Sequence, residues 1–176
     1  LMHIREANNN DAEDIKNLHL QAFDDTEAAE VADLAVSLLH AKSSVKIISL
    51  VAIEGDEIIG HVAFSPVFVD DADERFGYIL APLAVLPAQQ NKRVGSALVK
   101  EGVDIVSSSA ADIVFVYGDP GYYSRFGFNT DLAKGFLPPY TLKYPEGWHA
   151  LRTSATDIPE GGSLRIVEPL NDAELW

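Results

Sequence analysis

Residues 80–98 read LAPLAVLPAQQNKRVGSAL, and this stretch predicts how the middle of the chain folds. An apolar run stops at Pro87, a polar turn follows, and helical character begins at Val94. We interpret the stretch as a buried strand that leads directly into the N-terminus of a helix. The first backbone N–H groups of such a helix lack partners within it and carry the positive end of its dipole, so the turn is a candidate anion site.

The side chains at this turn favour the same interpretation. Lys92 and Arg93 are basic, and the small residues Gly95, Ser96 and Ala97 would let a ligand or a neighbouring backbone come close. A phosphate-bearing cofactor would fit there. The alternative is an ordinary junction between a strand and a helix that binds nothing. The turn contains neither a Walker loop nor a GxGxxG fingerprint.

Length and composition limit the classes of protein to consider. The chain has 176 residues and a net charge of −14, which suits a single globular domain over residues 1–176. It has no apolar run long enough to span a bilayer and no secretory signal pattern, so we expect a cytoplasmic protein without membrane contact. The acidic balance disfavours nucleic acid as a partner and favours cationic amines. Cysteine is absent and the five histidines lack metal-site spacing, so we expect no metal.

Hydrophobic periodicity predicts an alternation of strands and helices along the chain. Gly60 inside one expected strand indicates a bulge or a close backbone approach. The strands and helix around the opening stretch form a β-α-β unit, which predicts parallel strands with a ligand at their carboxyl ends. The expected strands are residues 2–7, 46–53, 57–68, 78–86, 112–117, 148–153 and 163–167, and the expected helices are residues 11–23, 27–40 and 94–107.

Two motifs in the right order resemble the signatures of the GCN5-related N-acetyltransferases (GNAT). Residues 83–87 followed by residues 90–95 (QNKRVG) are similar to the acyl-CoA-binding motif Gln/Arg-x-x-Gly-x-Gly/Ala after a strand that ends in proline. Gln90 and Gly95 match this motif, and Arg93 stands where its first glycine is usual. One strand later, residues 123–128 (YSRFGF) resemble the second signature, in which a tyrosine lies near the cofactor sulfur. Within the family, GDPxYYxRFGF with PLAVLP is most similar to a bacterial subgroup of predicted acetyltransferases.

The resemblance implies an α/β (α+β) fold. We expect a GNAT-like mixed, mostly antiparallel central sheet with a parallel β-α-β cofactor-binding unit and flanking helices. The core would cover about residues 2–130, and residues 131–176 would add strands and loops that complete the acceptor side. The cosubstrate would be acetyl-CoA, and the expected cofactor-binding residues are Leu83, Ala84, Val85, Gln90, Asn91, Lys92, Arg93, Val94, Gly95, Ser96 and Tyr123.

The implied activity is direct transfer of an acetyl group from acetyl-CoA to a primary amine of a small molecule or peptide. By resemblance, a backbone N–H within residues 83–85 holds the oxyanion and Tyr123 protonates the departing thiolate. Asp119 is a candidate base for the amine, with a water chain or a purely turn-forming Asp119 as alternatives. His61 is either another base or a hydrogen-bonded structural histidine.

The acceptor is expected between the first two helices and the late aromatic segment. Phe23, Asp24 and Asp25 lie at the helix junction, and residues 144–148 form the aromatic segment. The rival function is a non-catalytic acyl-CoA binding or sensing module, which Arg93 and the lack of an evident glutamate base keep open. A homodimer is kept as an option.

Overall fold

The computed structural model describes residues 1–72, 74 and 76–176. These residues form two compact units, the first from residues 1–64 and 81–102 and the second from residues 65–80 and 103–176. Two strands and one helix pass from one unit into the other, so each unit is described by itself.

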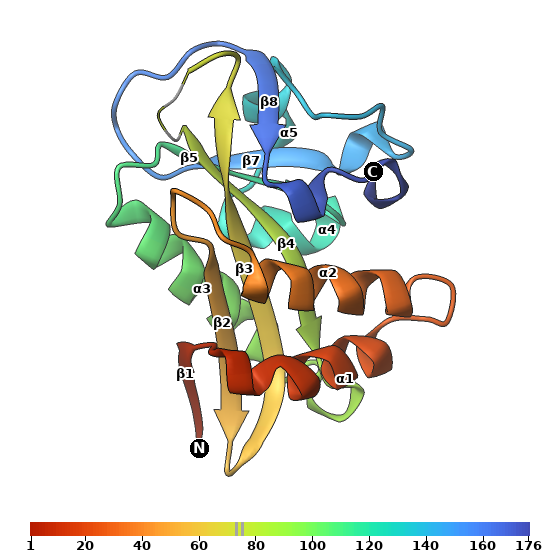
Figure 1. Cartoon of the computed structure of the whole chain (residues 1–176). Coiled ribbons are helices and arrows are strands. Elements are labelled where there is room, and N and C mark those ends of the chain that lie inside the picture. Colours follow the sequence, from red (N-terminus) through yellow and green to blue (C-terminus); the bar gives the residue numbers. More distant parts are fainter. Residues whose placement is uncertain (73, 75) are drawn as a thin grey trace. The chain divides into compact units, whose positions relative to one another are not determined.

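The first unit contains a three-stranded antiparallel arrangement covered by helices (Figure 1). Helices α1 and α2 are amphipathic, and their apolar positions recur at helical spacing, as predicted. The bounds of its elements are β1 Met2–Glu6, α1 Ala12–Ala22, α2 Ala28–His40, β2 Ile48–Glu54 and β3 Glu57–Val69, with the end of β4 Gly77–Val85 and the start of α3 Val94–Ser107.

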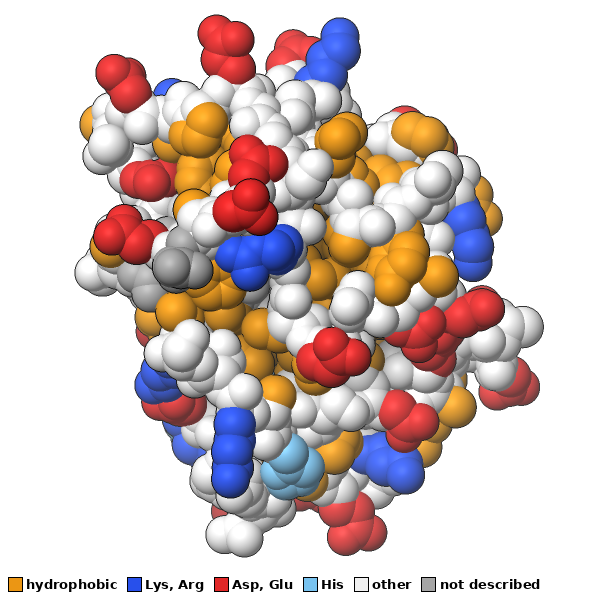
Figure 2. Space-filling model, turned by 45° about the horizontal axis from the view of Figure 1, so that its top comes forward, with side chains coloured by type: hydrophobic (Ala, Val, Ile, Leu, Met, Phe, Trp, Pro, Cys, Tyr) orange, Lys and Arg blue, Asp and Glu red, His pale blue; other side chains and the backbone are white. Residues whose placement is uncertain are grey.

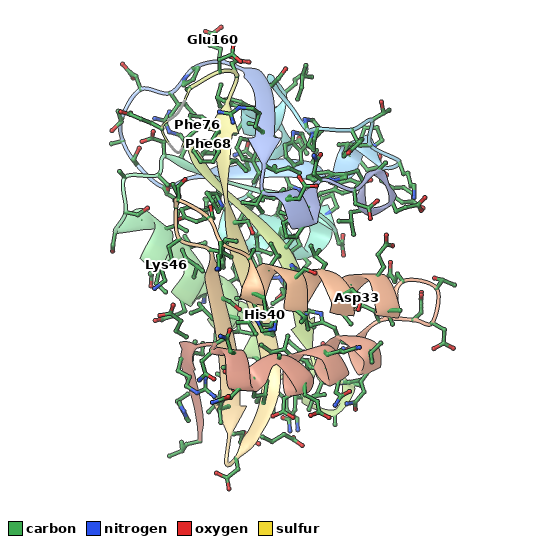
Figure 3. All side chains as sticks on the ribbon, viewed as in Figure 1. Asp33, His40, Lys46, Phe68, Phe76 and Glu160 are labelled. Atoms are coloured by element: carbon green, nitrogen blue, oxygen red, sulfur yellow. The ribbon has the colours of Figure 1, made fainter. Side chains whose placement is uncertain are left out.

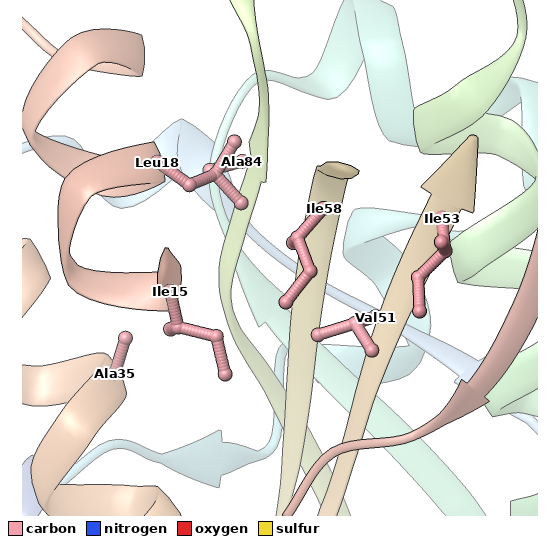
Figure 4. Close-up of a cluster of buried hydrophobic side chains, with 7 residues drawn as sticks. All are labelled: Ile15, Leu18, Ala35, Val51, Ile53, Ile58 and Ala84. Carbon is pink, nitrogen blue, oxygen red and sulfur yellow. The ribbon is translucent and has the colours of Figure 1, made fainter. Parts of the chain in front are cut away.

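A buried apolar cluster holds the helices of this unit to its strands (Figure 4). Side chains at alternate positions of a strand point to the same face, so Val51 and Ile53 of β2 meet α1 and α2 together. Ala84 of β4 belongs to the same cluster. Its members are Ile15, Leu18, Ala35, Val51, Ile53, Ile58 and Ala84.

The other face of the strands in this unit packs against α3. Gly60 has no side chain, which allows α3 to lie close to the strand. The register of β2 and β3 shifts beside Gly60, which confirms the predicted bulge. A Cβ placed on Gly60 would lie 2.9 Å from side-chain atoms of both Val94 and Leu98 of α3. The predicted close approach is therefore also confirmed, and a larger residue at this position would push α3 away from the strand.

The second unit is built around aromatic side chains. Phe115 of β5 stacks on Trp148 of β7 with ring centroids 5.1 Å apart, and the Trp148 indole donates a hydrogen bond of 3.0 Å to the Phe136 carbonyl. Its elements are the end of β3, the start of β4, the end of α3, β5 Ile113–Tyr117, α4 Pro120–Tyr123, α5 Thr130–Ala133, β6 Phe136–Leu137, β7 Trp148–Arg152 and β8 Gly162–Ile166.

The strands confirm the predicted fold class. They follow the order β1-β2-β3-β4-β5-β7, with β8 paired to β3 and β6. Most pairs are antiparallel, but β4 and β5 pair in parallel from Gly77↔Ile113 to Leu80↔Val116, as the β-α-β pattern predicted. The short β6 also pairs with β8 in parallel. The protein is thus a mixed α/β protein with a mostly antiparallel sheet and flanking helices.

On the face shown in Figure 2, the charged side chains are spread out. Acidic side chains are scattered over the visible face rather than gathered in one patch (Figure 2). Within the described part of the chain, no helix combines the length and the apolar character needed to cross a membrane.

Candidate functional site

The turn between β4 and α3 holds most of the predicted cofactor contacts. The side chains of residues 90–93 are exposed, and the Gln90 amide donates a hydrogen bond of 3.2 Å to the Val85 carbonyl, which ties the turn to β4. The Ala97 N–H donates to the Arg93 carbonyl at 3.0 Å at the start of α3. The N–H groups of Val94, Gly95 and Ser96 precede this bond in the first turn of α3, so they stay candidate donors for an anion.

The backbone of this turn is strained at two residues. Asn91 has a φ of 63° and Arg93 a φ of 67°, both in the left-handed region. Asparagine tolerates this region better than most residues, but an arginine there costs roughly 1–2 kcal/mol. Arg93 therefore keeps the conformation that the first glycine of the motif would adopt without strain.

The end of β4 presents its predicted cofactor-binding residues on two faces. Ala84 is buried in the apolar cluster, whereas Leu83 and Val85 are half-buried and point to the opposite face. Ala84 could therefore contact a cofactor only through its backbone. The Leu86 N–H donates to the Ile59 carbonyl at 2.9 Å, which fixes the end of the strand.

In the second unit, a short helix after β5 positions Tyr123. Asp119 caps this helix, because its carboxylate accepts a hydrogen bond of 2.9 Å from the Gly121 N–H. Gly127, with a φ of 96°, ends the following turn. A Cβ on Gly118 would lie 2.8 Å from the Tyr123 ring, so this glycine leaves room for the phenol.

Tyr123 is surrounded by other rings. Its ring centroid lies 5.0 Å from that of Tyr122, 5.8 Å from Phe128 and 5.7 Å from His149. Burial, followed by the nearby Tyr122 and Asp119, raises the pKa of the Tyr123 phenol well above its ordinary value of about 10. The phenol is therefore held more firmly in its protonated form than that of an exposed tyrosine.

His149 is a neighbour of Tyr123 that the sequence analysis did not single out. Its Nδ1 lies 2.8 Å from the Gly147 carbonyl, which only accepts hydrogen bonds, so Nδ1 carries the proton and Nε2 is an acceptor. Nε2 is buried and has no hydrogen-bond partner among the described residues. Burial lowers the pKa of this imidazole. The only sequence signal was a histidine in a late aromatic strand, without diagnostic spacing.

His61, considered as a second base, is a buried structural histidine in the first unit. Both ring nitrogens are occupied, with Nδ1 2.9 Å from His19 Nε2 and Nε2 2.9 Å from Ser49 Oγ. Burial and the neighbouring His19 lower its pKa well below the ordinary value. This arrangement matches the structural alternative.

The expected acceptor residues lie in different units. Phe23 stacks on His19 at 5.9 Å, and the Asp24 carboxylate accepts hydrogen bonds from the Thr26 hydroxyl and N–H. In the second unit, the Tyr144 N–H donates to the Tyr117 hydroxyl at 2.8 Å, and the Tyr144 side chain is exposed. Among the described residues, no three histidines, aspartates or glutamates are grouped so that they could hold a metal ion.

Comparison with known sequences gives relatives over most of the chain. A protein named uncharacterised N-acetyltransferase YjhQ from Escherichia coli K12 is 32% identical over 163 residues, which are 90% of this chain and 88% of the relative. The YhbS protein of the same strain, also named an uncharacterised N-acetyltransferase, is 37% identical over 120 residues, 67% of this chain and 68% of the relative.

Two solved structures are similar over nearly the whole chain. A GNAT acetyltransferase from Brucella melitensis in complex with acetyl-CoA has a TM-score of 0.75 and 29% identity, and the match covers 97% of this chain and 98% of the other. E. coli YhbS in complex with CoA has a TM-score of 0.81 and 27% identity, with 97% and 92% coverage.

A family profile described as "Acetyltransferase (GNAT) domain" matches residues 3–130. This range contains both motifs recognised in the sequence, the turn before α3 and the segment around Tyr123. The chain therefore belongs to the GNAT family of acetyltransferases, which are acyl-transferring enzymes.

Proposed function

We propose that the protein transfers an acetyl group from acetyl-CoA directly to a primary amine of a small molecule or peptide. Family membership supports acyl transfer, and the acetyl-CoA and CoA complexes of the two similar structures support the cosubstrate. The observation that carries the proposal is the turn before α3, where the first turn of a helix and two exposed basic side chains occur together.

The cosubstrate would be held mainly by backbone groups of the first unit. When bound, acetyl-CoA supplies an acetyl group already activated as a thioester. The N–H groups of Val94, Gly95 and Ser96 would hold its pyrophosphate, with Lys92 and Arg93 adding charge. A backbone N–H within residues 83–85 would stabilise the oxyanion that develops during transfer.

Tyr123 would donate a proton to the leaving thiolate. The environment that raises its pKa keeps the phenol protonated at neutral pH, so the donor is present in every molecule. The same shift makes the phenol a weaker acid, so proton donation would occur only as the sulfur becomes strongly basic. Donation would therefore be coupled to cleavage of the thioester.

The amine must lose a proton before it can attack. The chain carries 27 acidic and 13 basic side chains, which favours the approach of a cationic amine. We keep Asp119 or a water chain as the base. The Asp119 carboxylate is exposed but also caps α4, and this capping contact supports its turn-forming role.

Binding is tested first by thermal-shift titration with acetyl-CoA. Stabilisation should grow with ligand concentration, as linkage requires. Lys92→Glu should weaken the response, because it reverses a charge beside the expected pyrophosphate. Lys16→Glu makes the same change at an exposed position of α1 and is the matched control. An equal response in all three proteins would reject the placement of the cosubstrate.

Turnover is tested by a screen of amines, polyamines, amino acids and peptide N-termini, with release of free CoA followed at several pH values. Turnover with at least one amine supports the proposed function. Turnover with hydroxyl or thiol acceptors alone would reject the amine assignment. Tight binding without any turnover would favour the acyl-CoA sensing module instead.

A further inference from the structure

A pocket of about 490 Å³ lies within the first unit, at the end of α2 and on the segment that leads to β2. Its volume falls within the range of small-molecule sites. Lys46, which lines it, is labelled on this segment in Figure 3. The apolar part of the lining includes Leu38, Leu39 and Ile47, and the polar part includes Lys42, Lys46 and Ser49.

The charges around this pocket favour an anion. Two lysines line it against one carboxylate, that of Glu6, which pairs with Lys46 at 2.8 Å. Lys42 forms no salt bridge with any of the described carboxylates. In a chain with a net charge of −14, such a cationic rim is a local exception. The apolar part of the lining suits a short hydrocarbon chain.

Ser49 connects the pocket to a buried hydrogen-bonded chain. Its side chain is on the same strand face as Val51, which packs against α1 and α2, and it is only 6% exposed. Ser49 Oγ lies 2.9 Å from His61 Nε2, and His61 Nδ1 lies 2.9 Å from His19 Nε2. Burial lowers the pKa of His19 to about 4 and that of His61 well below its ordinary value, so both rings are neutral.

Two neutral arrangements satisfy these contacts. In the first, His19 Nε2–H donates to His61 Nδ1, His61 Nε2–H donates to Ser49 Oγ, and the Ser49 proton is free to point into the pocket. In the second, the Ser49 hydroxyl donates to His61 Nε2 and His61 Nδ1–H donates to His19 Nε2. In the second arrangement the His19 proton is on Nδ1, which is buried and has no hydrogen-bond partner among the described residues. Conversion of the first arrangement to the second moves one proton along each link towards Ser49, releases the pocket-facing Ser49 proton to water and returns one proton from water to His19 Nδ1, so the net charge does not change.

We propose that this pocket binds a short-chain carboxylate, and that Lys42 and the Ser49 hydroxyl hold its charged group. Binding fixes the first arrangement of the hydrogen bonds that join Ser49, His61 and His19. An anion needs hydrogen-bond donors, and only the first arrangement offers the Ser49 proton to the pocket. Occupancy of the pocket therefore determines which nitrogen of His61 and of His19 carries its proton, two and three hydrogen bonds away from the ligand.

The experiment uses protein with ¹⁵N-labelled histidines, titrated with sodium butyrate, while ¹H–¹⁵N spectra report the protonated ring nitrogen. We expect a saturable change that ends with His61 and His19 both protonated at Nε2. Lys42→Gln should weaken butyrate binding up to about fivefold, the range of a partly exposed ion pair. Lys16→Gln is the matched control and should not change it. Butylamine, a cation of the same length, should give no saturable response.

The readouts do not depend on acetyl transfer, so this proposal and the proposed function can fail separately. Ser49→Ala should abolish the change of tautomer. If this buried substitution prevents folding, Lys42→Gln alone still decides the placement. An unchanged ring-nitrogen spectrum at saturating butyrate, or binding that Lys42→Gln leaves intact, would overturn the proposal.

Discussion

The turn before α3 places Asn91 and Arg93 at φ values of 63° and 67°, whereas the turn after Tyr123 uses Gly127, at 96°, as its left-handed residue. Each turn belongs to one of the two segments that carry the family signatures. Glycine reaches this region without steric cost, but a residue with a Cβ does so at roughly 1–2 kcal/mol. The same backbone requirement is thus met with strain in one segment and without strain in the other.

The difference indicates where a side chain is needed. Strained residues persist when the surrounding structure or a function compensates for them. Arg93 is exposed and stands next to Lys92 at a helix N-terminus, where a guanidinium can contact a phosphate directly. Gly127 ends a short turn, and a Cβ there would lie 3.2 Å from Leu151. In the second segment we expect Tyr123 to be the functional side chain instead.

Tyr123→Phe should have the largest effect, because it removes the proposed proton donor of the second segment and leaves the backbone unchanged. We expect turnover to fall about tenfold or more, with acetyl-CoA affinity nearly unchanged, since only the proton donor is lost. Steady-state kinetics and calorimetric titration measure the two quantities. Tyr122→Phe is the matched control and should keep its turnover. Equal turnover in Tyr123→Phe and the parent protein would reduce Tyr123 to a packing residue.

Gly127→Ala should destabilise the protein by more than about 1 kcal/mol, because alanine is strained at a positive φ and its Cβ also crowds Leu151. Gly55→Ala is the matched control, since Gly55 has a φ of 62° with nothing within 4 Å of an added Cβ. The Gly55→Ala variant should therefore show only the free-energy cost of placing alanine at a positive φ. Urea denaturation gives both free energies of unfolding. Equal losses would mean that Leu151 adapts without cost.

Most of the fold could be predicted because its elements follow local periodicity. The helices α1, α2 and α3 and the strands β2 to β5 lie within a few residues of the predicted ranges. The two-residue strand β6 was missed because its definition depends on pairing with β8, which is distant in sequence. The one-turn helix α5 was missed because it is too short to show a period and depends on a cap from Asn129.

The candidate site was predictable where a motif is contiguous. Residues 90–95 predicted the turn, but an arginine at position 93 does not by itself indicate a left-handed backbone conformation. The contact between His19 and His61 joins residues 42 positions apart, and no spacing rule connects them. The contact of His149 with Tyr123 could not be predicted for the same reason, because it depends on the pairing of β5 with β7.

Arg93→Gly should have the smallest effect on stability. It separates two properties of the first segment, the backbone strain at Arg93 and the proposed contact of its guanidinium with the cosubstrate. Glycine relieves the left-handed strain but gives the unfolded chain more freedom, so we expect a gain of only a few tenths of a kcal/mol to about 1 kcal/mol. Arg93→Ala keeps the strain and should show no gain. Both variants lose the guanidinium, so their affinity for acetyl-CoA should fall by a similar factor of about two to five. Urea denaturation and calorimetric titration measure these effects. If neither variant weakens binding, the strain at Arg93 does not serve the cosubstrate, and the contrast with Gly127 has no functional meaning.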